Sequence, residues 1–210
     1  QVLDSIKDYL KILREDIYKM DGRPLALEKY IALGLNALND ALKIKPNYPV
    51  GDDNEPTNTA PAGEPDIECF YDHYNSICEV TMLKDRSQWY NEGQPVMRHL
   101  RDFEEKNKSK NAYCLFIAPS LHVDTIETFW FAIKHGYRGK KQKIIPLTIN
   151  QFSDLLITLI TLRQKGKKFS HKSLMDLYEG ISHVDDFNSS DDWIKIIPNK
   201  IQTWKKALLK

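Results

Sequence analysis

Two acidic side chains in the middle of the chain, Asp66 and Glu79, have the spacing of a facing pair on a β-hairpin. Each lies at or within a short apolar run, and the two are symmetric about Asp72 and His73, which begin a turn-like stretch. Residues symmetric about a tight turn face each other on the same side of the two strands, with Cβ atoms about 5 Å apart. A register shift of one residue would place them on opposite faces, and the local sequence leaves both registers open.

Two carboxylates at that separation repel each other unless a cation lies between them. Carboxylate oxygens are hard ligands that suit Mg²⁺, which binds few protein carboxylates and retains several waters. A bound Mg²⁺ can activate water and neutralise charge on a phosphate. The alternative is a pair of solvated surface carboxylates, but Glu79 lies within the apolar run 77–83, where a charge needs a partner. The surroundings of Glu79 therefore favour a metal site.

The elements that must position this pair are predicted from hydrophobic periodicity and from breaks in it. Apolar residues at helical spacing predict helices before the pair, over 2–20 and 25–42. The proline-rich stretch 45–65 predicts a long loop inside the domain rather than a domain boundary. Short apolar runs predict strands, and later periodic segments predict helices; the strands are 66–71, 77–83, 113–118 and 143–149, and the helices are 123–135, 151–164, 170–181 and 191–209.

These elements predict an α/β fold with a central mixed sheet of about four strands flanked by helices, in one domain over residues 1–210. The strand–helix–strand order favours parallel pairing through right-handed crossovers. Pro146 predicts an edge or end position for the last strand, because proline lacks a backbone N–H. Asn150 and Ser170 are the expected caps of the two helices that follow.

Composition excludes several classes of protein. An apolar content of 41% with 28% charged residues is ordinary for a globular chain and excludes whole-chain disorder. A net charge of +1 does not by itself indicate a nucleic-acid partner. The longest apolar run, 155–162, is far shorter than the roughly 20 residues of a membrane helix, so no membrane partner is expected. Three cysteines without CxxC spacing are expected to be buried, reduced thiols of a cytoplasmic protein.

A known motif resembles this pattern. Pro65-Asp66, followed after a dozen residues by Glu79-Val80-Thr81, is similar to the PD-(D/E)xK nuclease motif. Residues 64–103, with an upstream glutamate, resemble the catalytic domain of type IIS restriction endonucleases of the AlwI kind, and most of all the large, strand-nicking subunit of heterodimeric members. The resemblance implies a restriction-endonuclease-like fold, a bacterial cytoplasmic location and an active site of four acidic residues and one histidine, which fall on Glu28, Asp66, Glu79, Glu92 and His99.

The resemblance also implies an activity and partners. It predicts a Mg²⁺-dependent endonuclease, in which Mn²⁺ can substitute, that hydrolyses one phosphodiester bond in one strand of double-stranded DNA. Asp66, Glu79 and the backbone carbonyl of Val80 would hold the metal. Cleavage of both strands would need a second, smaller catalytic subunit that docks transiently. A sequence-recognition domain is expected before residue 1.

One position departs from the superfamily pattern. The motif has a lysine two residues after its glutamate, and here that position is Thr81. His99 and Lys84 are candidates for the missing positive charge, and the general base stays open. The departure sustains an alternative, a catalytically dead nuclease fold that serves as a DNA-binding or protein-interaction module. The strand-like runs disfavour a third hypothesis, a purely helical interaction domain.

Several candidates also have a structural interpretation. Taken alone, Glu28 fits a solvated helix face, Glu92 fits a helix N-terminus, and His99 fits a structural histidine. Glu68 is a spare candidate ligand on the strand of Asp66. Two basic clusters, 138–143 and 165–168, are candidates for phosphate contacts or for solvated turn lysines. The remaining histidines lack the spacing of a zinc site.

Overall fold

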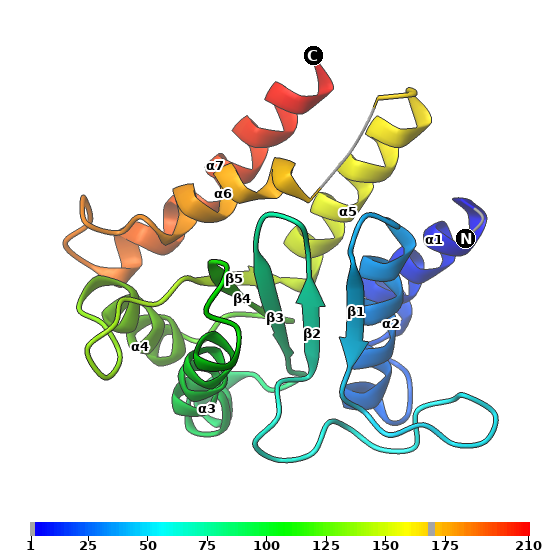
Figure 1. Ribbon diagram of the computed structural model, residues 1–210, viewed down its shortest axis with the longest axis horizontal. Coiled ribbons are helices and arrows are strands. Elements are labelled where there is room, and N and C mark those ends of the chain that lie inside the picture. The colour runs from blue at the N-terminus through cyan, green and yellow to red at the C-terminus, as the bar shows by residue number, and fades with distance from the viewer. Residues whose placement is uncertain (1–2, 168–170) are drawn as a thin grey trace.

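A five-stranded mixed sheet forms the centre of the computed structural model, which describes residues 3–167 and 171–210 (Figure 1). The strands lie side by side in chain order. The first two pairings are antiparallel and the last two are parallel, so the predicted mixed α/β sheet is confirmed. The strands are β1 (Lys43–Pro46), β2 (Ile67–Phe70), β3 (Asn75–Val80), β4 (Ala112–Ala118) and β5 (Ile144–Thr148).

The strand β1 was not predicted, and it makes the sheet five-stranded rather than four-stranded. The helix expected to reach residue 42 ends at Ala37, and the loop expected from residue 45 begins only after Pro46. β1 pairs with β2 alone, at the edge of the sheet. A proline at the end of an edge strand leaves no ladder hydrogen bond unmade, so the local proline signal did not preclude a strand.

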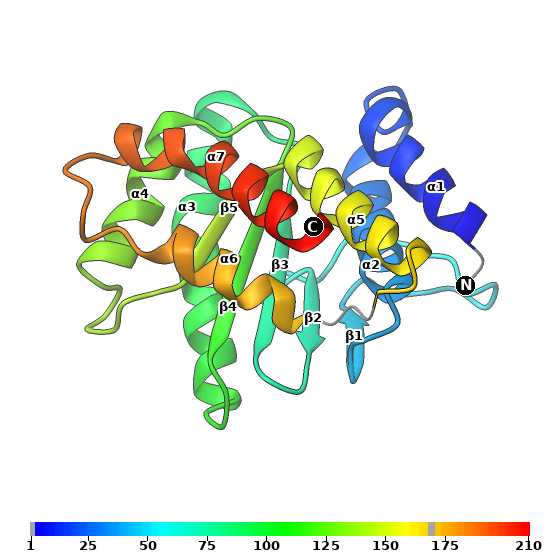
Figure 2. The same ribbon diagram turned by 90° about the horizontal axis from the view of Figure 1, so that it is seen from above.

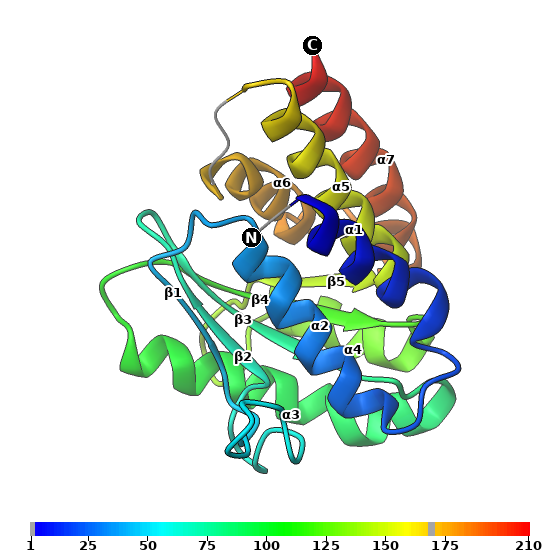
Figure 3. The ribbon, with the colours of Figure 1, turned by 90° about the vertical axis from the view of Figure 1, so that its right-hand side faces the viewer.

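Helices cover both faces of the sheet. Figure 3 shows α3 and α4 on one side and α5, α6 and α7 on the other, and in Figure 2 the second group lies over the strands. Helices α3 and α4 are the crossovers of two parallel β–α–β units, so they lie on the same face. The helices are α1 (Leu3–Lys11, continued by a π-helical turn Ile12–Asp16), α2 (Arg23–Ala37), α3 (Asp85–Lys106), α4 (Val123–Lys134), α5 (Ile149–Gln164), α6 (Lys172–Ser182) and α7 (Ser190–Leu209).

The core lies between these layers and is centred on β4, whose seven residues are all buried. Its neighbour β5 is the other edge strand, which confirms the position that Pro146 predicted. The cysteines are buried free thiols, also as expected: Cys69, Cys78 and Cys114. In the part of the chain that the structure describes, no helix combines the length and the apolar character needed to cross a membrane.

The cap of α5 differs from the prediction. Thr148, not Asn150, caps this helix, through a capping box in which its side chain and that of Gln151 each accept from the other's backbone N–H. The predicted cap Ser170 lies outside the described residues. The helix α7 begins one residue before the predicted start, with Ser189 as its cap.

Candidate active site

The β2–β3 hairpin brings the two central carboxylates together. Ile67 pairs with Cys78, so the same register places Asp66 opposite Glu79, as the symmetric spacing predicted. The backbone N–H of Val80 donates to Oδ2 of Asp66 at 2.7 Å, which fixes the aspartate against the neighbouring strand. The strands are shorter than predicted, because β2 begins after Asp66 and β3 ends at Val80. The pair therefore lies at the open end of the hairpin rather than within it.

One cavity of about 450 Å³ is lined by all five residues that the resemblance singled out. The hairpin contributes Asp66 and Glu79, α2 contributes Glu28, and α3 contributes Glu92 and His99. Glu28 is 4% exposed and so does not lie on a solvated helix face. Glu92 lies in the third turn of α3, so the helix N-terminus alternative is wrong for this residue.

The long loop between β1 and β2 forms one wall of this cavity, through residues 59–64. The backbone N–H of Ala60 donates to Oε2 of Glu28 at 3.0 Å and so joins the loop to α2. An ion pair between Lys29 and Glu55 joins the same two segments. The loop, drawn in cyan in Figure 1, is therefore part of the site.

His99 contacts Glu79 of the central carboxylate pair directly. Its Nδ1 lies 2.9 Å from Oε1 of Glu79, and both side chains are buried. The other ring nitrogen, Nε2, is buried without a hydrogen-bond partner. Burial, followed by the nearby Arg98 charge, lowers the pKa of His99. The ring is therefore favoured in its neutral form, with one nitrogen uncommitted.

The carboxylates of the cavity resist ionisation. Burial raises the pKa of Asp66 and of Glu79 well above the usual range, and repulsion from neighbouring carboxylates adds to it. Burial raises the pKa of Glu28 to about 7, against the hydrogen bond from Ala60. The pKa of Glu92 is also raised by burial, although a hydrogen bond with Thr81 lowers it. A cation in the cavity would reverse this balance.

The predicted metal ligands form a set of hard oxygens. Within residues 3–167 and 171–210, no group of three or more histidine, cysteine, aspartate or glutamate side chains is arranged to hold a metal ion. The predicted set needs only two carboxylates, Asp66 and Glu79, and the main-chain carbonyl of Val80. Mg²⁺ binds through one or two carboxylates and keeps several waters, so these residues fit it.

The structure also shows which of the remaining charged residues line the cavity. Lys84 is exposed, with its Nζ 5.9 Å from the centroid of the Tyr18 ring, and does not line the cavity. Glu68 pairs with Lys45 at 2.6 Å and lines a neighbouring hollow instead. Arg98, which the sequence analysis missed, lines the cavity. Its only sequence signal was its position immediately before His99.

The sequence of the chain matches a known protein family. The model of the AlwI restriction endonuclease family matches residues 1–155, which is most of the chain. The chain belongs to the AlwI restriction endonuclease family. No curated protein sequence matches it.

A solved structure supports the fold of this AlwI-family chain. It is similar to the crystal structure of the small subunit of the heterodimeric restriction endonuclease R.BspD6I, with a TM-score of 0.79 and 24% sequence identity. The match covers 92% of this chain and 98% of that one. The predicted restriction-endonuclease-like fold is confirmed. The expected likeness to a large subunit is not confirmed, because this match is to a small one.

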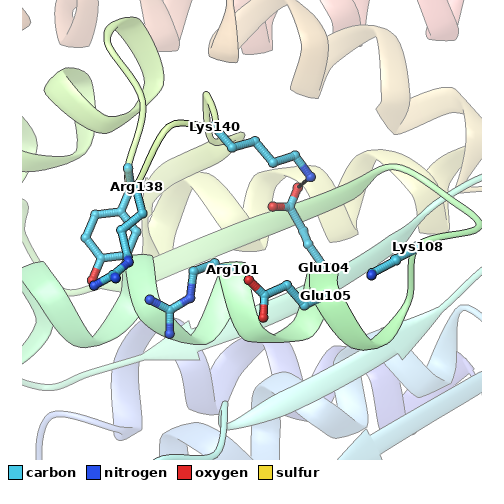
Figure 4. A pocket seen from close by; sticks show the side chains of 7 residues that line it. Arg101, Glu104, Glu105, Lys108, Arg138 and Lys140 are labelled. Atoms are coloured by element: carbon cyan, nitrogen blue, oxygen red, sulfur yellow. Dashed lines mark ion pairs between the residues drawn. The ribbon is translucent and has the colours of Figure 1, made fainter.

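A second region of the AlwI-family chain lies farther along α3. A groove of about 650 Å³ lies between the C-terminal half of α3 and the turn 137–140. Figure 4 shows the side chains that line it. Arg138 and Lys140 of the basic cluster 138–143 line this groove. Carboxylates pair with the lysines of the cluster: Lys140 with Glu104, Lys141 with Asp185, and Lys143 with Glu179. In the other cluster, Lys168 lies outside the described residues. Local ion pairing thus weakens the phosphate interpretation of the cluster 138–143.

Proposed function

We propose that this chain is the cleavage unit of a restriction endonuclease and that it hydrolyses one phosphodiester bond in one strand of double-stranded DNA, using Mg²⁺. The family assignment supports a DNA endonuclease. The observation that carries the proposal is the single cavity in which a facing Asp66–Glu79 pair, two further glutamates and His99 meet. Buried carboxylates with raised pKa values, gathered around one space, are costly to the fold and are typical of functional sites.

In the proposed site Asp66, Glu79 and the carbonyl of Val80 hold the metal, and Glu28 and Glu92 complete the acidic surroundings. When bound, Mg²⁺ would activate water and neutralise charge on the phosphate. Thr81 does not replace the motif lysine, because its hydroxyl hydrogen-bonds Glu92 and accepts from the backbone N–H of Leu83. Mn²⁺ has the same preference for oxygen ligands and is expected to substitute.

His99 is the proposed general base. In this proposal ionised Glu79 accepts the ring proton at Nδ1, which leaves the lone pair at Nε2, an atom that is buried without a hydrogen-bond partner. The water oxygen forms a bond to phosphorus while one ester P–O bond breaks. One proton of the water passes to Nε2 of His99, and the leaving oxygen takes a proton from solvent. The neutral ring favoured by burial is the form that this step needs.

One such site cuts one strand, so we propose that a second catalytic subunit cuts the other. The structurally similar small subunit belongs to a heterodimeric enzyme, which supports an assembly of this kind. We propose that recognition of the DNA sequence comes from a domain before residue 1, as the sequence analysis predicts.

A plasmid-nicking assay tests the proposal. The chain, at high concentration with Mg²⁺ or Mn²⁺, is compared with Asp66→Ala and Glu79→Ala. We expect metal-dependent conversion of supercoiled to open-circle DNA, lost in both variants. The alternative, a dead nuclease-like module, is favoured by Thr81 in the lysine position. It predicts no nicking, even after fusion to a DNA-reading domain, and no Mg²⁺ binding that the two variants could lose.

A further inference from the structure

We propose that Arg98 is the phosphate-binding cation of this site and takes the part that the motif lysine would otherwise play. This inference rests on the proposed nuclease function and extends it to a residue outside the predicted set. Arg98 lies on α3 immediately before His99 in the chain, and it lines the same cavity as Glu92 and His99.

Arg98 is the only lysine or arginine among the described residues that line the cavity. Five carboxylates line the same space: Glu28, Glu64, Asp66, Glu79 and Glu92. Burial raises the pKa of Glu79 and lowers that of His99, and the charge of Arg98 acts to lower both. None of the ion pairs in the described part of the chain involves Arg98.

Other cations near the site are committed elsewhere. Arg101, one turn farther along α3, pairs with Asp102 through Nε at 2.8 Å and lies over the ring of Tyr137. Lys45 pairs with a glutamate on β2. Lys84 lies outside the cavity wall. Arg98 thus differs from its neighbours in being both inside the site and without a carboxylate partner.

Binding of a substrate phosphate in this cavity requires a positively charged side chain. One divalent cation does not balance five carboxylates, and the incoming phosphodiester adds a further negative charge. A guanidinium matches two phosphate oxygens at once through parallel N–H donors, and it stays charged at any working pH. Placed beside the reacting phosphorus, it stabilises the negative charge that develops in the transition state. We therefore expect Arg98 to contact substrate directly.

The test compares Arg98→Gln and Arg98→Lys with Arg101→Gln, which removes an arginine one turn away on the same helix. We expect Arg98→Gln to lower kcat for nicking roughly 10²–10³-fold, as for loss of one donor to a transition-state oxyanion. Arg98→Lys should recover part of this loss, because it restores the charge but not the paired donors. Arg101→Gln should stay within about threefold of the unsubstituted chain.

A binding measurement makes the result independent of turnover. Duplex binding is followed by fluorescence anisotropy at low salt, with Ca²⁺ in place of Mg²⁺. Loss of one phosphate contact should reduce the slope of log K against log salt by about 0.9 in Arg98→Gln, with an unchanged melting temperature. Arg98→Gln with unchanged slope and kcat, while Asp66→Ala is inactive, overturns the role of Arg98 alone. A chain that neither nicks nor binds duplex overturns the nuclease proposal as well.

Discussion

Two segments of α3 face regions of opposite character. The middle of the helix, from Asn91 to His99, lines a cavity in which carboxylates are buried together and Arg98 is the one lysine or arginine among the described lining residues. The C-terminal half lines the groove of Figure 4, where Lys140 is paired with Glu104, and Arg101 with Asp102. Burial raises the pKa of Glu104 too, but there Lys140 and Lys143 act against it.

This difference separates a site from a stabilised surface. In the groove, opposite charges satisfy each other, and such exposed pairs contribute little to stability. In the cavity, the described residues include no lysine or arginine in an ion pair with the buried carboxylates, and a bound cation would offset the cost of burying them. The cavity lacks enough positive charge to balance these carboxylates, which indicates that a cation is one of its ligands. The following variants test whether the two regions differ in this way.

The largest expected effect comes from Glu79→Gln. Loss of a metal ligand should reduce nicking by roughly 10³-fold or more, since a metal contributes several kcal/mol to the transition state. The same substitution removes a disfavoured buried charge, so the metal-free protein should melt about 3 °C higher at pH 8, a shift of ~1 kcal/mol for a chain of this size. Glu104→Gln in the groove should leave nicking unchanged and not raise the melting temperature. A Glu79→Gln protein that melts at a lower temperature than the unsubstituted chain would contradict the proposed difference between the cavity and the groove.

His99→Gln is expected to have the next largest effect. It removes the proposed proton acceptor but keeps a side chain that can hydrogen-bond Glu79. General acid–base catalysis contributes roughly 10²–10⁴-fold, so kcat should fall within that range while the KM for DNA changes little. Steady-state kinetics that follow the amount of nicked plasmid measure both kcat and the KM for DNA. An unchanged kcat would leave His99 a structural residue.

The pH dependence of stability follows from the raised pKa values. A carboxyl whose pKa is higher in the folded protein contributes stability below its unfolded pKa and loses it as the pH rises through the folded value. For Glu28 the loss falls between about 4.5 and about 7, and for Asp66 and Glu79 it extends higher. The metal-free chain should therefore melt at lower temperature as the pH rises from 5 to 8.

Added Mg²⁺ should oppose this loss at pH 8 and have little effect at pH 5, where the ligands are protonated. Differential scanning calorimetry with and without Mg²⁺ measures the contrast. Asp66→Asn should reduce both the pH effect and the response to Mg²⁺. If the metal-free chain instead became more stable as the pH rises, basic side chains of the protein would already neutralise the carboxylates of the cavity.

The smallest expected effect belongs to the groove. Arg138 has a positive φ of 50° in the turn bridged by Tyr137 and Lys140, with Gly139 beside it at 89°. Asparagine adopts this conformation more readily than arginine, so Arg138→Asn should raise the melting temperature by ~2 °C, for a gain of about 0.5–1 kcal/mol. Nicking should stay within about twofold. A large loss of nicking would instead make the groove part of the DNA-binding surface.

Local sequence determined only part of the candidate site. The symmetry of Asp66 and Glu79 about a tight turn allowed them to face each other, and the observed pairing of β2 with β3 selected this register over the shifted one that the sequence had left open. Most strands and helices around them also followed from short-range periodicity, although several ended one to five residues from the predicted bounds, and neither β1 nor the bounds of α3 were predicted. The periodicity of each element depends on neighbours close in the chain, so the sequence alone contains it.

Tertiary structure decided the rest. Whether Glu28 is solvated or buried depends on the loop 59–64 that closes over it, and whether Lys140 is free depends on Glu104, on a different element. The strand β1 forms only because β2 offers it a partner, against the local proline signal. Arg98 carried no motif and became a candidate only through its position in the cavity wall. Partners distant in the chain are set by packing of the whole fold, which periodicity and spacing do not encode.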